Sequence, residues 1–178
     1  MPIAHPTPVS SVYGPVKSWR VGASLGIDLL LETSTCSFNC VYCQLGNIQL
    51  KTAERRIYVS TAQVEKDFKH SAWVEADIVT FSGSGEPTLA LNLAEVIHLI
   101  KEYSGKPVMV LTNGTLLHDP AVRADLYQAD VVAVKLDAAT EDFSANESSR
   151  CGESRWPGWW LVRKPFAKAT VQSKENPR

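Results

Sequence analysis

The feature that most constrains this chain is a group of three cysteines within eight residues. Cys36, Cys40 and Cys43 follow the spacing C-x3-C-x2-C. Thiolates are soft ligands, and a loop of this length can wrap three of them around one compact metal centre. A closed structural zinc site needs four ligands, and the only other cysteine, Cys151, lies far along the chain. The spacing therefore predicts a soft metal centre with one open coordination position; zinc and three incidental buried cysteines are the alternatives.

The composition is that of an ordinary globular protein. The chain has 178 residues, of which 44% are hydrophobic and 21% charged, and one compact domain is expected. Clustered thiols indicate metal binding in a reducing compartment more than a disulfide framework. The N-terminus shows no signal-peptide pattern, and no apolar run reaches the roughly 18 residues that span a bilayer. We therefore expect a cytoplasmic protein that does not contact membranes.

Strands and helices are predicted to alternate along the chain. Runs of apolar residues predict buried strands over 24–32, 77–82, 107–112 and 130–137. Helices are expected to begin at Ser60, Asn92 and Asp119, which are typical N-cap residues. This alternation favours βα units around a parallel sheet, an α/β fold. Because right-handed crossovers bring the ends of parallel strands to one face, the cysteine loop and the residues after the later strands should converge there.

Composition also suggests how the chain is divided. Residues 1–23 are rich in proline, glycine and serine and are expected to form an extended leader, followed by a core over 24–150. Residues 151–178 carry six basic and two acidic residues and three of the five tryptophans, without a regular hydrophobic period. We expect a divergent, disordered tail over 151–178. An aromatic and basic patch that binds nucleic acid is the alternative.

Four segments together resemble one enzyme family. They are Tyr13-Gly-Pro-Val16, Ser24-Leu-Gly-Ile-Asp28, the cysteine loop from Cys36 to Gly46, and Phe81-Ser-Gly-Ser-Gly-Glu-Pro-Thr88. With an aromatic residue before its third cysteine, the chain resembles the radical S-adenosylmethionine (SAM) superfamily. More narrowly, it resembles a prokaryotic branch grouped with the wyosine-forming tRNA-modifying enzymes. The resemblance covers about residues 10–140 and stops after Asn146.

The resemblance implies both a fold and a chemistry. The fold is a partial (β/α) barrel of radical SAM type, with about four βα units present. Cys36, Cys40 and Cys43 would bind a [4Fe–4S] cluster whose fourth iron chelates SAM. The reduced cluster would cleave SAM into methionine and a 5′-deoxyadenosyl radical, which takes a hydrogen atom from the substrate. The implied enzyme is an iron–sulfur oxidoreductase with an electron donor such as flavodoxin or ferredoxin. A tRNA base is a candidate substrate, although the net charge of −5 over residues 1–150 gives it no electrostatic support.

The resemblance also implies SAM contacts in the loop after the second strand. Gly83, Ser84 and Gly85 would let backbone carbonyls approach the SAM ammonium, and the carboxylate of Glu86 would favour that cation. Tyr42 would pack near the adenine; ordinary packing within its loop is the alternative.

Two further residues follow the later strands. Asn113 could meet polar groups of SAM or form a plain Asn-Gly turn. Asp137 could face SAM or the substrate, or it could cap the next helix.

The chain also departs from the branch that it resembles. Trp19 stands where a second arginine is usual, and the basic residue usually found shortly before the first cysteine is missing. About four βα units are expected, and the edge of the fourth strand would be exposed and prone to aggregation. The alternative function is therefore a truncated, non-catalytic fragment that binds an iron–sulfur cluster or zinc.

Overall fold

The fold is an open six-stranded sheet covered by helices. The computed structural model describes residues 9–31, 33–135, 148–150 and 160–163. The main sheet consists of β1 (Val12–Ser18), β2 (Gly22–Ile27), β6 (Ile78–Phe81), β7 (Val108–Thr112), β8 (Val131–Val134) and β10 (Trp160–Arg163), in that order. The helices are α1 (Thr61–Lys69), α2 (Leu93–Ser104) and α3 (Pro120–Leu126), with short 3₁₀ turns η1 (Trp73–Glu75) and η2 (Pro87–Leu89). The expected α/β class is confirmed. The sheet has two free ends, so the described residues form no closed barrel.

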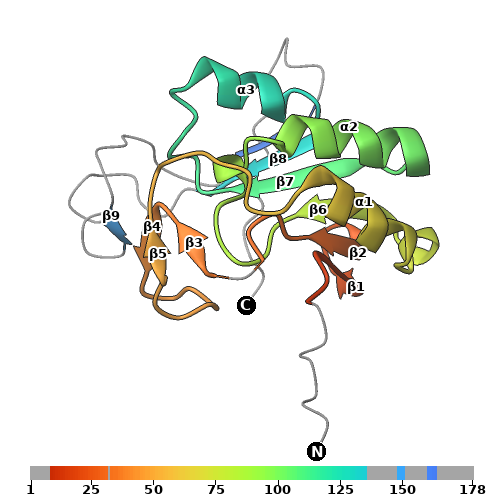
Figure 1. Ribbon diagram of the computed structural model, residues 1–178, viewed down its shortest axis with the longest axis horizontal. Helices are drawn as coiled ribbons and strands as arrows, with labels where there is room; N and C mark the ends of the chain where they lie inside the picture. Colours follow the sequence, from red (N-terminus) through yellow and green to blue (C-terminus); the bar gives the residue numbers. More distant parts are fainter. Residues whose placement is uncertain (1–8, 32, 136–147, 151–159, 164–178) are drawn as a thin grey trace, which may run out of the picture.

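The four predicted strands form the parallel centre of the sheet. β2, β6, β7 and β8 pair in parallel, and apolar side chains from all four strands belong to the hydrophobic core. Leu25, Val79, Phe81 and Val110 are completely buried there. Figure 1 shows α1 and α2 side by side along these strands, with α3 beyond α2.

Both edges of the sheet are antiparallel strands that the sequence did not indicate. β1 pairs with β2 and lies within the segment expected as a leader. β10 pairs with β8, so the expectation of an exposed edge at the fourth strand is wrong. Within the expected tail, residues 160–163 are therefore a strand, and its other residues lie outside the described part. β1 gave no sequence signal because most of its residues are exposed or half-buried, and its pairing rests on backbone hydrogen bonds.

Two small pairs of strands, each with one strand from the start of the cysteine loop, lie beside the main sheet. They are β3 (Thr35–Cys36) with β5 (Leu50–Lys51), and β4 (Phe38–Cys40) with β9 (Ser148–Arg150). Figure 1 shows β3, β4 and β5 grouped at one end of the molecule. The loop between β2 and α1 is thus folded into short extended pieces.

The predicted helix starts are confirmed, but one capping residue acts differently. The side chains of Ser60 and Asp119 accept hydrogen bonds from the first turns of α1 and α3. Asn92 precedes α2 without capping it. Instead, its side-chain amide donates to the Val59 carbonyl and to the Thr61 hydroxyl, at 3.0 and 3.1 Å, and joins the starts of two helices. Among the described residues, no helix has the length and apolar character needed to cross a membrane.

Candidate metal and cofactor site

A pocket of about 200 Å³ lies where β6, β7 and β8 end. Its lining includes all three clustered cysteines, Cys36, Cys40 and Cys43. Residues after the three strands also line the pocket, among them Ser82, Gly83, Gly85, Glu86, Asn113 and Lys135. The structure therefore brings the cysteine loop and the strand ends together, as the crossover argument predicted.

The three cysteines are free thiols, and each is half-buried. Cys40 and Cys43 are joined by a turn in which the Cys43 N–H donates to the Cys40 carbonyl at 3.0 Å. Within the described part of the chain, no three His, Cys, Asp or Glu side chains lie close enough together to hold a metal ion. The thiols share one pocket and are a soft donor set, so they suit a soft metal centre. Coordination requires their side chains to turn toward a common point.

The surroundings of the Cys36 thiol disfavour its thiolate form. Burial, and then the nearby carboxylate of Glu86, raise its pKa to about 11. Two donors partly oppose this effect, the Phe38 N–H and the side-chain amide of Asn113, each 3.4 Å from the sulfur. A thiol with this pKa is protonated at neutral pH, so binding of a metal there has to release the proton.

The Gly83-Ser84-Gly85 loop is fastened to the cysteine loop by its backbone. The Thr35 N–H donates to the Ser84 carbonyl at 2.8 Å, and the Glu86 N–H donates to the Thr35 carbonyl at 3.1 Å. Gly85 has φ +154°, and a Cβ there would lie 1.7 Å from the Thr35 oxygen. Only glycine permits this close approach. The start of the cysteine loop is therefore held directly against the glycine loop.

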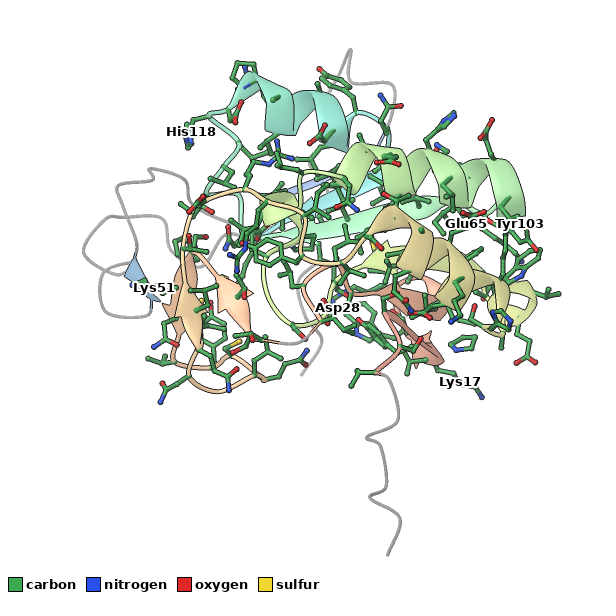
Figure 2. All side chains as sticks on the ribbon, in the orientation of Figure 1. Lys17, Asp28, Lys51, Glu65, Tyr103 and His118 are labelled. Atoms are coloured by element: carbon green, nitrogen blue, oxygen red, sulfur yellow. The ribbon has the colours of Figure 1, made fainter. Side chains whose placement is uncertain are left out.

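Asp28 holds the other side of the same loop and was not predicted as a site residue. It follows β2 and is buried. One carboxylate oxygen accepts from the Ser84 N–H at 2.8 Å, and the other accepts from Leu30 at 2.9 Å. A Cβ on Gly83 would lie 2.5 Å from the Asp28 carboxyl carbon. Figure 2 shows Asp28 near the middle of the molecule. The available signal was a lone carboxylate at the end of an apolar strand.

Glu86 is buried, borders the pocket and joins the ends of two strands. Its Oε1 accepts from the Thr88 N–H, the Thr88 hydroxyl and the Thr112 hydroxyl, at 3.1, 2.6 and 2.7 Å. Its Oε2 accepts from the Asn113 N–H at 2.6 Å. Burial raises the pKa of Glu86, while these hydrogen bonds oppose the rise. A carboxylate has about four acceptor positions, and most of those on Glu86 are occupied by protein groups.

The side chain of Asn113 likewise contacts protein groups at both ends. Its amide nitrogen donates to the Ser37 hydroxyl at 3.0 Å and to the Cys36 sulfur at 3.4 Å. Its oxygen accepts from the N–H and the hydroxyl of Thr115, at 3.0 and 2.7 Å. Asn113 therefore forms the turn that Asn-Gly suggested, since Gly114 has φ +78°, and it also contacts a cysteine sulfur.

Lys135 is a second site residue that sequence reasoning did not select. It is the first residue after β8, and its ammonium nitrogen lies 3.4 Å from the Cys40 sulfur. The same nitrogen lies 3.9 Å from the centre of the Tyr42 ring. Tyr42, predicted to lie near an adenine, is 50% exposed. Asp137, the remaining predicted site residue, lies outside the described residues.

Known proteins resemble this chain over most of its length. A UPF0026 protein of Synechocystis sp. is 52% identical over 136 residues, which are 76% of this chain and 51% of that protein. A UPF0026 protein of Methanocaldococcus jannaschii is 35% identical, over 72% of this chain and 41% of the relative. A probable GTP 3′,8-cyclase of Saccharolobus islandicus is 31% identical, over 69% and 38%. The chain spans about half the length of the first of these relatives, and less of the others.

A family model matches a segment that begins later and ends later than the predicted resemblance over about residues 10–140. The model of the radical SAM superfamily matches residues 32–168. The match includes the whole cysteine loop and continues beyond Asn146, where the resemblance was expected to stop. Since it covers more than half of the chain, this protein belongs to the radical SAM superfamily.

Proposed function

We propose that this chain binds a [4Fe–4S] cluster through Cys36, Cys40 and Cys43 and binds SAM beside it. The observation that carries the proposal is one pocket lined by all three cysteines and by the residues after β6, β7 and β8. Membership of the superfamily supports the choice of cofactors, because its members generally use a [4Fe–4S] cluster and SAM. When both are bound, the cluster supplies the electron for reductive cleavage of SAM to a 5′-deoxyadenosyl radical.

The protein's own part in this proposal is to bind and orient the cofactors. The glycine loop lets backbone approach the SAM amino group, and Glu86 Oε2, which accepts one hydrogen bond from the described residues, has an acceptor position for that cation. Asn113, Tyr42 and Asp137 remain proposed contacts for SAM. The pocket is smaller than the roughly 300–1,000 Å³ of sites that enclose a drug-sized ligand. The described residues would therefore form one wall of the SAM site.

The proposal also covers the fold around the site, the class of substrate and the electron donor. We place the site in a core over residues 24–150, within a partial (β/α) barrel to which the parallel sheet belongs. The substrate is proposed to be a nucleobase, either in a free nucleotide such as GTP or in a tRNA. The first option follows the printed name of the cyclase relatives, and the second follows the resemblance to the wyosine-forming branch. Flavodoxin or ferredoxin is the proposed electron donor.

Anaerobic reconstitution with iron and sulfide tests the proposal. We expect about four irons per chain, and release of 5′-deoxyadenosine when dithionite and SAM are added. A Cys43→Ser variant is the matched control, since it removes one thiolate ligand and should lower both iron content and 5′-deoxyadenosine. A fully loaded cluster that releases no 5′-deoxyadenosine would contradict the proposal and favour a non-catalytic metal-binding protein. Uptake of zinc in place of iron would contradict the choice of cluster.

A further inference from the structure

Lys135 is the only residue with a cationic side chain among the described residues that line the pocket. Its backbone is fixed at the end of β8, where its N–H donates to the Thr112 carbonyl at 2.8 Å. Its ammonium reaches the Cys40 sulfur at 3.4 Å and lies over the Tyr42 ring. A cation above an aromatic face is attracted by the ring, so Tyr42 helps to hold the ammonium beside the sulfur.

The charges around the cysteines are distributed unevenly. The Cys36 sulfur is contacted by two neutral donors, the Phe38 N–H and the Asn113 amide, each at 3.4 Å. Cys40 instead faces an ammonium. The half-buried position of Cys40 and Lys135 strengthens this interaction relative to water. Among the described residues of the pocket lining, the Lys135 ammonium is therefore the one positive charge that can offset negative charge on a thiolate ligand.

We propose that Lys135 is a positioning residue that donates a hydrogen bond to the cluster-bound Cys40 sulfur and raises the reduction potential of the cluster. This inference rests on the proposed function. Reduction adds one electron to a cluster that three thiolates already make negative. Hydrogen bonds to the sulfurs and nearby charge are among the factors that set such potentials. A cation at hydrogen-bond distance stabilises the reduced form more than the oxidised form, so an external donor can reduce the cluster more easily.

The test compares midpoint potentials of the reconstituted full chain. Lys135→Met removes the charge and the donor and keeps an unbranched apolar side chain. Lys135→Arg keeps the positive charge. Lys17→Met is the matched control, because it makes the same substitution at a lysine of β1. Figure 2 shows Lys17 far from β3 and β5, which flank the cysteine loop. The clusters are titrated with dithionite without SAM and followed by electron paramagnetic resonance.

At a fixed applied potential, we expect Lys135→Met to lower the ratio of reduced to oxidised cluster about tenfold. For a one-electron couple, this corresponds to a midpoint potential that is about 59 mV lower. Lys135→Arg should shift the potential less, and Lys17→Met should match the wild type. A fully loaded Lys135→Met cluster with the wild-type potential would overturn the inference. So would a variant whose SAM affinity falls while its potential stays unchanged, because Lys135 would then be a SAM ligand.

Two outcomes separate this inference from the proposed function. If the wild-type chain assembles no cluster, the proposed function fails, and the inference fails with it. If the wild type assembles a cluster but Lys135→Met does not, the potential is measured on Lys135→Gln in its place. Glutamine keeps a neutral hydrogen-bond donor without the charge. We then expect a downward shift smaller than tenfold, and an unchanged potential for a loaded Lys135→Gln cluster would overturn the inference.

Discussion

Replacing Gly85 by alanine should separate the glycine loop from the start of the cysteine loop. The added Cβ would lie 1.7 Å from the Thr35 carbonyl oxygen and 2.5 Å from its carbon. Both obstacles are backbone atoms, so no side-chain rotation can remove the overlap. The backbone of the two loops has to move apart.

The expected loss of unfolding free energy is the sum of three local contributions. Holding a non-glycine residue at φ +154° costs about 1–3 kcal/mol. The movement also breaks the hydrogen bonds from the Thr35 N–H to Ser84 and from the Glu86 N–H to Thr35, each of which contributes about 0.5–1.5 kcal/mol. We therefore expect Gly85→Ala to lower the free energy of unfolding by about 2–6 kcal/mol, a large share of the 5–15 kcal/mol typical of a domain.

Urea unfolding of the metal-free protein measures this loss. Gly46→Ala is the matched control, because Gly46 lies just beyond the third cysteine, has φ +69° and has no heavy atom within 4 Å of its added Cβ. It should cost only the left-handed conformation, about 1–2 kcal/mol. Iron content after reconstitution should fall in Gly85→Ala and stay near wild type in Gly46→Ala. If the two variants unfold at the same urea concentration, the contact between Thr35 and Gly85 does not fasten the loops as argued.

Three further predictions concern single side chains. Cys40→Ser should lower the iron content after reconstitution and leave the free energy of unfolding within about 0.5 kcal/mol of wild type, because its thiol is half-buried; unchanged iron content would exclude Cys40 as a ligand. Asn113→Ala should lower the free energy of unfolding by about 1–3 kcal/mol, since buried Thr115 and Ser37 lose partners; a neutral change in urea unfolding would contradict this. Burial raises the pKa of Asp67, but hydrogen bonds from Ser11 and its other neighbours outweigh this effect and lower the pKa. Its stabilisation is therefore present above the ordinary Asp pKa of about 3.9 and is lost as pH falls through the lowered value. Asp67→Asn should be less stable near pH 7 and lose less stability on acidification; parallel unfolding curves against pH would refute this assignment.

Local signals in the sequence determined the ends of the helices. Ser60 and Asp119 cap α1 and α3 through partners two or three residues away, and Gly105 ends α2 with φ +65°. Such contacts depend only on neighbouring residues, so the sequence contains all the information that they require. The apolar runs of the parallel strands were equally clear signals, since β2, β6 and β7 bury most of their residues.

Asn92 shows where this local reasoning stops. It has the residue type of an N-cap, but its amide contacts Val59 and Thr61, more than thirty residues earlier in the chain. The packing of α1 against α2 brings those partners within reach. β1 and β10 are similar cases, because an edge strand is defined by its pairing more than by a pattern of buried side chains.

The cysteine spacing by itself determined that the chain presents three soft ligands from one loop. Only the tertiary structure decided what surrounds them. Asp28 meets Ser84 across 56 positions, and Lys135 meets Cys40 across 95. These contacts arise because parallel strands joined by crossovers end side by side, so the order of strands in the sheet selects which distant residues become neighbours.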